Sequence, residues 1–202
     1  MMKTNAQLRP ARESDASGLA CLFDIAARGN ALWTWSTLRE PGQSAIEVGR
    51  NRIRTNTAHP SYYKNFTIAE IEGAVAGTFV GRLIPVPYHR GDAANLPETL
   101  APYLALEAIA AGSWDLFVVA VYPEFRGHGL GSELLSHAEK IARKSGASRM
   151  SIIVEDANAG ALRLYLRHGF AEWARRPYVP FPGSMDEGDW VLLGKGLATE
   201  DT

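Results

Sequence analysis

The spacing of apolar residues along the chain predicts a mixture of helices and strands. Apolar residues recur at helical spacing, close to capping residues, prolines and glycines, over residues 14–29, 97–111, 130–144 and 158–168. Alternating or continuous apolar runs predict strands over residues 8–10, 66–71, 75–84, 116–121, 150–154 and 190–193. Residues 31–58 are ambiguous and hold a further candidate helix at 43–55. The order of these elements is that of a mixed α/β protein.

Three connections indicate how the sheet is built. The turn at Glu72-Gly73 joins its flanking strands into an antiparallel hairpin. The run Leu116–Val121 is almost wholly apolar, which is typical of a strand buried on both faces. A helix closed by Gly146 separates this run from the strand Met150–Val154, so we expect the two strands to be parallel neighbours joined by a right-handed crossover.

Composition limits the class of protein. The chain has 202 residues, 46% hydrophobic and 21% charged, values typical of a folded globular protein. We expect one domain over residues 1–202, with an insertion at 85–112 that faces the substrate and a loop-rich segment at 175–189. The net charge of -1 argues against a nucleic-acid partner, because such proteins normally carry a basic surplus.

Cysteine and histidine usage argues against a metal site. Cys21 is the single cysteine, so the simplest location is a reducing cytoplasm. The five histidines show no metal-ligand spacing. The first residues lack an apolar targeting segment, and no apolar run approaches the roughly 20 residues that span a bilayer. The sequence therefore predicts a soluble cytoplasmic protein without a metal or a membrane partner.

The segment with most chemistry is the glycine-rich run Arg126-Gly127-His128-Gly129-Leu130-Gly131, between a predicted strand and a predicted helix. Backbone N–H groups and the positive end of a helix point outward at such a place and bind phosphate, and Arg126 adds positive charge. No lysine follows Gly131, so the Walker pattern fails, and Ser132 spoils the dinucleotide fingerprint. A plain strand-to-helix turn stays open on this segment alone.

Two motifs together resemble the GNAT N-acetyltransferases. Arg126, Gly129 and Gly131 match the family's first motif, Arg/Gln-x-x-Gly-x-Gly/Ala after a strand. One helix and one strand later, the run Asn158-x-x-Ala161-x-x-Leu164-Tyr165, followed by Gly169-Phe170, is similar to its second. The resemblance is strong over Trp114–Phe170. It implies an α/β (α+β) fold, with a mixed, mostly antiparallel sheet splayed between two parallel strands and flanked by helices.

The resemblance also implies acetyl-CoA as the acyl donor and names its contacts. The pantetheine arm is expected to pair with the backbone of Val119, Ala120 and Val121, as an added strand would. The pyrophosphate is expected on the amides of Gly127, His128, Gly129, Leu130 and Gly131, beside Arg126. Asn158 is expected first to cap its helix and also to contact the cofactor.

Two residues are candidates for proton transfer. By resemblance, Tyr165 stands beside the sulfur of CoA, where a phenol can protonate the departing thiolate; the alternative is a tyrosine packed in the core. Asp115 is the best candidate for the base that deprotonates the acceptor amine; the alternative is a solvated carboxylate at a strand end. Glu70, Glu107 and Tyr122 are weaker candidates for the same base.

The leading hypothesis is therefore an N-acyltransferase that moves an acetyl group from acetyl-CoA to a small-molecule or peptide primary amine by direct attack. A CoA-binding module without catalysis, acting as a sensor or partner subunit, is the alternative. The acceptor site is expected to draw on residues 31–58 and 85–112, with aromatic and acidic candidates Trp33, Trp35, Tyr88, Tyr103, Glu107 and Asp92. A homodimer through the last strand stays open.

Overall fold

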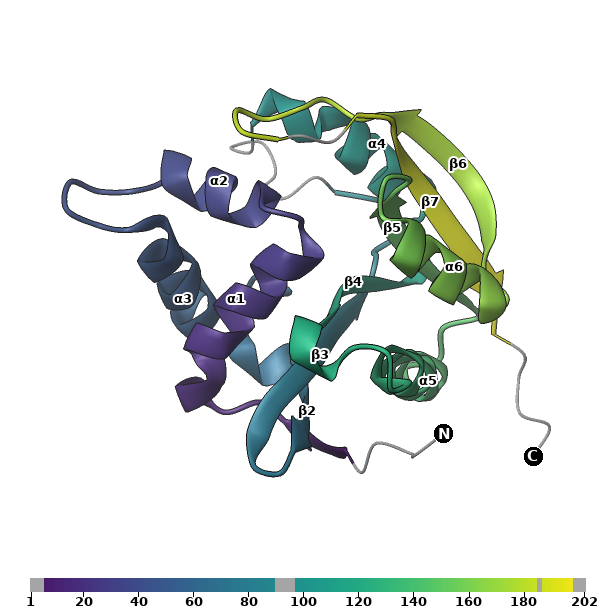
Figure 1. Cartoon of the computed structure of the whole chain (residues 1–202). Coiled ribbons are helices and arrows are strands. Elements are labelled where there is room, and N and C mark those ends of the chain that lie inside the picture. The colour runs from purple at the N-terminus through teal and green to yellow at the C-terminus, as the bar shows by residue number, and fades with distance from the viewer. Residues whose placement is uncertain (1–5, 90–96, 185–186, 198–202) are drawn as a thin grey trace. The chain divides into compact units, whose positions relative to one another are not determined.

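The computed structural model describes residues 6–89, 97–184 and 187–197 (Figure 1). Its strands are β1 (Gln7–Pro10), β2 (Thr67–Ile71), β3 (Ala74–Leu83), β4 (Trp114–Val121), β5 (Arg149–Glu155), β6 (Ala171–Pro177) and β7 (Asp189–Gly196). They form a seven-stranded sheet in the order β1-β2-β3-β4-β5-β7-β6, in which β4 and β5 are parallel. The pairs β1/β2, β2/β3, β5/β7 and β6/β7 are antiparallel. The predicted mixed, mostly antiparallel sheet is confirmed.

The helices are α1 (Ala16–Ala26), α2 (Asn30–Thr37), α3 (Ala45–Thr55), α4 (Ala101–Ile109), α5 (Leu130–Lys144) and α6 (Ala159–Arg167). The chain folds as two compact units. Unit 1 consists of residues 1–81 and 117–138, and unit 2 of residues 82–116 and 139–202. The chain passes between them within β3, β4 and α5, so neither unit is a continuous segment.

In unit 1, the predicted hairpin is confirmed: β2 and β3 pair through a turn in which Glu72 and Gly73 have φ of 51° and 81°. The helix predicted at 43–55 is α3, which starts with a capping box between Ser44 and Glu47. Helix α2, in the same ambiguous stretch, was not predicted. Its aromatic and polar residues lack a clear period, and burial of Ala31 and Trp35 against the unit's core holds it.

Helix α1 starts without a side-chain cap. Asp15 precedes the helix but its carboxylate does not cap it; the carboxylate accepts from the Arg12 N–H at 2.6 Å and pairs with the Arg9 guanidinium. Because Arg9 is on β1, this carboxylate ties the first strand to the first helix. The side chains of Leu19, Ala20 and Leu22 fill the core beneath α1.

In unit 2, the predicted loop at 175–189 is wrong at its start, because β6 extends to Pro177. Strand β6 forms the edge of the sheet, where a proline is tolerated. Trp173 lies over Gly194 of β7, where an added Cβ would come within 2.2 Å of the indole. Arg149 stacks on the same ring at 5.5 Å. The contacts of Trp173 with Gly194 and Arg149 hold β6 against β7, and no sequence pattern indicates them. The last strand, β7, is paired on both sides, so it has no free edge for a dimer contact.

Strand β4 is confirmed, but its second half is not buried on both faces. Val118 and Ala120 are buried, whereas Phe117, Val119 and Val121 are only half-buried. Its parallel ladder with β5 is short and consists of Trp114 opposite Met150 and Asp115 opposite Ser151. The helix α5 that follows has the bounds predicted from the sequence, and Gly146 closes it with φ of 80°.

Candidate functional site

The glycine turn of unit 1 has the backbone geometry that an anion site requires. Gly127 and Gly129 have φ of 84° and 87°, in the left-handed region that favours glycine, and a Cβ at either would meet no atom within 4 Å. Glycine is therefore required at both by the backbone conformation and not by crowding. Residues 126–129 are exposed, whereas Leu130 is buried and anchors the first turn of α5.

Several backbone N–H groups of this turn have no backbone acceptor among the described residues. Ser132 and Glu133 donate to the Gly129 carbonyl at 3.0 and 3.1 Å, which closes the first turn of α5. Within the residues that the structure describes, the N–H groups of Gly129, Leu130 and Gly131 donate to no other backbone group. Unsatisfied N–H groups at a helix start, together with the helix dipole, favour an anion.

Arg126 links this turn to β4. Its Nε donates to the Val121 carbonyl at 3.0 Å, while the residue itself is exposed. The guanidinium is thus held beside the end of the strand that precedes the turn. A planar guanidinium in a fixed place is suited to a phosphate oxygen.

The backbone of Val119, Ala120 and Val121 has a packed side and a side without a partner strand. An added Cβ on Gly77 would come within 2.7 Å of the Ala120 carbonyl oxygen, so β3 lies close against β4 in unit 1. The N–H of Tyr122 donates to the Ala76 carbonyl at 2.9 Å on the same side. In the described chain the ladder to β5 stops at Asp115, before these residues begin.

In unit 2, Asp115 is fully buried, 1% exposed, and is not the solvated carboxylate that one reading of the sequence expected. Burial, reinforced by the Glu107 carboxylate, raises its pKa to about 7, although Arg82 acts in the opposite direction. Its Oδ2 has no hydrogen-bond partner among the described residues. Such a carboxyl changes its charge near neutral pH, as a general base must.

Two serine hydroxyls lie beside Asp115. Ser151 Oγ donates to Asp115 Oδ1 at 3.4 Å, a long hydrogen bond that favours the ionised carboxyl and lowers its pKa. Ser113 Oγ donates to the Ala110 carbonyl at 2.6 Å and lies 2.7 Å from Ser151 Oγ, where either hydroxyl can be the donor. Burial therefore raises the pKa of Asp115 in spite of Ser151 and Arg82.

Glu107, an alternative base, is also buried, and each of its carboxylate oxygens has a partner. Arg82 forms an ion pair with Glu107 Oε1, and the Tyr88 hydroxyl donates to Oε2 at 2.7 Å. Tyr103, one helical turn earlier on α4, packs edge-on against Trp190 at 5.3 Å. Burial and the carboxylates of Asp115 and Glu107 raise the pKa of Tyr103. Glu107 is thus not a solvated charge, and both of its carboxylate oxygens have partners.

Tyr165 is buried on α6, 5% exposed, with its ring 6.1 Å from that of Phe170. Burial raises its pKa, so the phenol is neutral over the whole physiological range. Asn158 caps α6 by accepting from the Ala161 N–H at 3.3 Å, as predicted. Within the described chain no interaction joins Tyr165 to Asp115, so the structure does not bring these two candidates into contact.

The remaining candidates have structural partners. Glu70 pairs with Arg9, and the Tyr122 hydroxyl donates to the Gly18 carbonyl at 3.2 Å. Trp35 is buried against Gly49, where an added Cβ would come within 2.3 Å of its ring. Asp92 lies outside the described residues. Arg82, Ser113 and Ser151 were not predicted as part of this cluster. A charged or hydroxyl residue inside an apolar strand pattern was the available signal for Arg82 in β3 and Ser151 in β5, whereas Ser113 precedes β4 and has no such signal.

Neither a metal-binding cluster nor a membrane-spanning helix is found among the described residues. In the part of the chain that the structure describes, no three His, Cys, Asp or Glu residues lie close enough together to hold a metal ion. No helix in that part combines the length and the apolar character needed to cross a membrane.

Curated relatives match part of the chain. Streptothricin acetyltransferase from Streptomyces lavendulae is 35% identical over 89 residues, which are 42% of this chain and 47% of that protein. The [ribosomal protein bS18]-alanine N-acetyltransferase of Escherichia coli K12 is 35% identical over 90 residues, 44% of this chain and 61% of that protein. The matched stretch thus spans about half the length of these relatives.

Solved structures share the fold over nearly the whole chain. An N-acetyltransferase from Staphylococcus aureus Mu50 superposes with a TM-score of 0.67 at 17% identity and covers 94% of this chain and 100% of that one. The YncA protein of Salmonella typhimurium, solved with its cofactor acetyl-CoA, gives a TM-score of 0.60 at 19% identity, with 98% and 97% covered.

The match to a known family includes both sequence motifs. Residues 30–170 match the Acetyltransferase (GNAT) family, which is well over half of the chain. The glycine turn before α5 and the Asn158-capped helix that carries Tyr165 both lie within the matched residues. The protein therefore belongs to the GNAT family of acetyltransferases.

Proposed function

We propose that this protein is an N-acetyltransferase that moves an acetyl group from acetyl-CoA to a primary amine by direct attack in a ternary complex. The amine nitrogen forms a bond to the acetyl carbonyl carbon, the carbon–sulfur bond breaks, and the CoA thiolate takes up a proton. The nitrogen must lose a proton before it attacks, because an ammonium has no lone pair. The observation that carries the proposal is the glycine turn at 126–131, with its left-handed Gly127 and Gly129, in a chain of the GNAT family.

The cofactor contacts proposed for the glycine turn and β4 belong to unit 1, and the one proposed for Asn158 belongs to unit 2. The amides of residues 127–131 and the guanidinium of Arg126 would hold the pyrophosphate, and the open surroundings of Gly127 and Gly129 leave room for it. The pantetheine amides would pair with the backbone of Val119–Val121, which needs no particular side chain. The unpaired side of β4 after Asp115 supports that role. Asn158 has its amide oxygen engaged in capping α6, which leaves its NH₂ group for the cofactor contact.

Proton transfer is assigned to two residues of unit 2. Tyr165, as a neutral phenol, would donate a proton to the CoA thiolate. Asp115, whose pKa is about 7, would accept the proton of the amine; because its side chain is buried, we propose that water carries the proton to it. The relatives are named for different acceptors, so the acceptor proposed here is a primary amine and no narrower class.

The first experiment is titration calorimetry of the purified protein with acetyl-CoA. The wild type is expected to bind one equivalent, and a variant carrying Arg126→Ala and Gly129→Ala is expected to bind at least about tenfold more weakly, since it loses a charged contact and strains a left-handed position. The double variant Arg39→Ala and Gly42→Ala is the control and is expected to bind as the wild type does, because exposed Arg39 likewise donates to a backbone carbonyl and Gly42 has a left-handed φ of 85° with no atom within 4 Å of an added Cβ.

An amine panel with detection of the released thiol then tests catalysis. Acetylation of at least one primary amine, weakened together with cofactor binding in the Arg126 and Gly129 variant, would support the transferase. Binding of acetyl-CoA without acetylation of any amine would favour the non-catalytic CoA-binding module instead. Absence of binding by the folded wild type would contradict both.

A further inference from the structure

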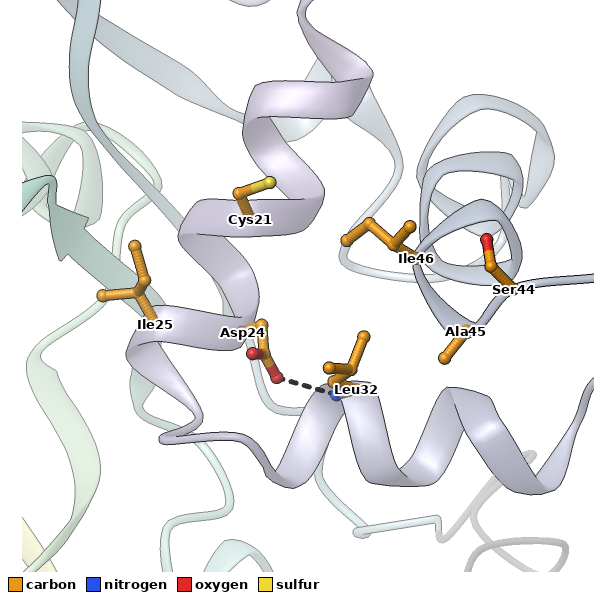
Figure 2. Close-up of a pocket in the computed structure, with 7 residues that line it drawn as sticks. All are labelled: Cys21, Asp24, Ile25, Leu32, Ser44, Ala45 and Ile46. Carbon is orange, nitrogen blue, oxygen red and sulfur yellow. Dashed lines mark hydrogen bonds between the residues drawn. The ribbon is translucent and has the colours of Figure 1, made fainter.

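Unit 1 contains a pocket formed by three helices, and the glycine turn is not part of its lining. Its volume is about 510 Å³, within the range of small-molecule sites. The lining comes from Cys21, Asp24 and Ile25 of α1, Leu32 of α2, and residues 44–46 at the start of α3. Figure 2 shows Asp24 of α1 bonded to Leu32 of α2, with Ala45 and Ile46 of α3 on the same side of α1, whereas Ile25 extends away from α3.

The walls of this pocket are mainly aliphatic. Leu32 is 39% exposed and Ile46 is 36% exposed, although both are large apolar residues. Cys21, Asp24 and Ile25 have the i, i+3, i+4 spacing of one helix face, opposite the face of α1 that fills the core. An apolar ligand body placed here would cover apolar surface that now faces water.

Among the described residues of the lining, Asp24 is the only charged one, and one of its two carboxylate oxygens has a hydrogen-bond partner. Oδ1 accepts from the Leu32 N–H at 2.7 Å, the bond drawn in Figure 2. Oδ2 has no hydrogen-bond partner among the described residues. Burial raises the pKa of Asp24 in spite of the Leu32 bond, so its carboxylate lacks a compensating positive charge.

We propose that this pocket binds a small organic ammonium ion, with the charged nitrogen on Asp24 Oδ2 and an aliphatic or aromatic body against Leu32 and Ile46. A positive nitrogen complements the single lining carboxylate, and the apolar body complements the walls. A neutral molecule would leave Oδ2 without a charged partner, and a carboxylate ligand would be repelled by it. The lining shares residues 32 and 44–46 with the stretch expected to supply the acceptor site, but it contains neither the glycine turn nor Asp115 or Tyr165, so binding here can be tested without acetyl transfer.

The single cysteine makes the test specific to this pocket. Cys21 is exposed and lies in the lining, so its reaction with an aromatic disulfide reagent reports whether the pocket is occupied. The probe is benzylammonium, compared with benzyl alcohol, which has the same shape without the charge. Benzylammonium is expected to slow the reaction in a saturable way, with the alcohol about tenfold weaker, since hydrogen bonds to charged groups are the stronger ones. No acetyl-CoA is present in this assay.

A matched pair of variants tests the role of the carboxylate. Asp24→Asn keeps an oxygen for the Leu32 N–H but removes the charge, so it is expected to lose the advantage of the amine over the alcohol. Glu72→Gln, at the exposed β2–β3 turn, is expected to retain it. The backbone amide resonance of Leu32 gives a second readout, because that N–H is bonded to Asp24.

Equal protection by the amine and the alcohol, or full protection by the amine in Asp24→Asn, would overturn the proposal. So would unchanged Cys21 reactivity together with an unmoved Leu32 resonance. Saturable movement of the Leu32 resonance that requires Asp24 would support it even if Cys21 stays reactive. Because the transferase assay is separate, failure here would leave the proposed function standing.

Discussion

The glycine turn of unit 1 (residues 126–131) and the polar cluster of unit 2 around Asp115 and Glu107 hold their polar groups in opposite environments, one exposed to water and the other buried. In the turn, several backbone N–H groups have no backbone acceptor among the described residues, and an added Cβ at Gly127 or Gly129 would meet no atom within 4 Å. In the cluster, Asp115 and Glu107 are almost wholly removed from water and lie beside Arg82, Tyr88 and Tyr103. The first arrangement suits a charged group from outside, as proposed for the cofactor; the second shifts the pKa of the protein's own groups.

The difference teaches how each kind of site is encoded. A turn that uses backbone atoms requires glycine at fixed spacing, so its sequence pattern is short and local. A shifted pKa requires burial and neighbouring charges, which come from α4, β4 and β5 together. The same carboxylate on an exposed strand end would have an ordinary pKa.

The largest expected effect concerns the proton on Asp115. Its folded pKa of about 7 lies above the usual 3.8, so between these values the folded state holds a proton that the unfolded state releases. The free energy of unfolding should therefore fall as pH rises through this window, by about 4 kcal/mol, and level off above it. Asp115→Asn is expected to flatten this slope in urea unfolding measured from pH 4 to pH 8.

The exposed Glu124 provides the control for that measurement, since Glu124→Gln should keep the wild-type slope. If Asp115 is also the base, Asp115→Asn should lower amine acetylation while it raises stability at pH 8. If the free energy of unfolding of Asp115→Asn depends on pH as the wild type's does, Asp115 does not hold a proton in the folded state. The contrast between this cluster and the glycine turn would then fail.

The second prediction concerns the ion pair in the same cluster. Glu107→Ala removes a buried carboxylate from the partly exposed Arg82 and should lower the free energy of unfolding by about 3 kcal/mol. Glu13→Ala, which breaks the solvent-exposed pair with Arg54, should lower it by less than about 1 kcal/mol. Equal losses in the two variants would mean that burial does not distinguish the cluster from the surface.

The third prediction separates binding from proton transfer. Tyr165→Phe keeps the ring against Phe170 but removes the hydroxyl, so kcat should fall about 100-fold, as for loss of a general acid. The Kd for acetyl-CoA, measured by calorimetry, should change by less than about threefold, because the glycine turn is untouched. Equal losses in kcat and affinity would contradict the role of acid.

The smallest expected effect tests a different kind of glycine in unit 1. Gly77→Ala would bring a methyl group within 2.7 Å of the Ala120 carbonyl oxygen, a backbone atom that cannot easily move, and should cost about 1–2 kcal/mol of stability. Gly160→Ala, in α6 with open space around it, should instead stabilise by about 0.5–1 kcal/mol. The Tm of both variants tests this prediction. A Gly77→Ala variant as stable as the wild type would show that β3 and β4 can move apart at this point without a loss of stability.

Much of the fold was predictable because its signals are local. Helix α5 has the predicted bounds, since its apolar stripe and the left-handed Gly146 lie within one segment. The hairpin of β2 and β3 was predicted from the turn at Glu72-Gly73. Helix α2 and strand β6 were missed because neither has a clear period. Trp35 over Gly49 and Trp173 over Gly194 hold them, and these contacts join residues distant in the sequence.

The sequence by itself determined the family resemblance, the positions of the glycine turn and the Asn158 cap, and most element boundaries, because these depend on backbone conformation and short-range spacing. Only the tertiary structure decided that Asp115 is buried beside Glu107, that Ser151 and Ser113 lie in line with it, and that Asp24 faces an apolar pocket. Burial and charge environment arise from segments that are far apart in the chain, so no local pattern carries them.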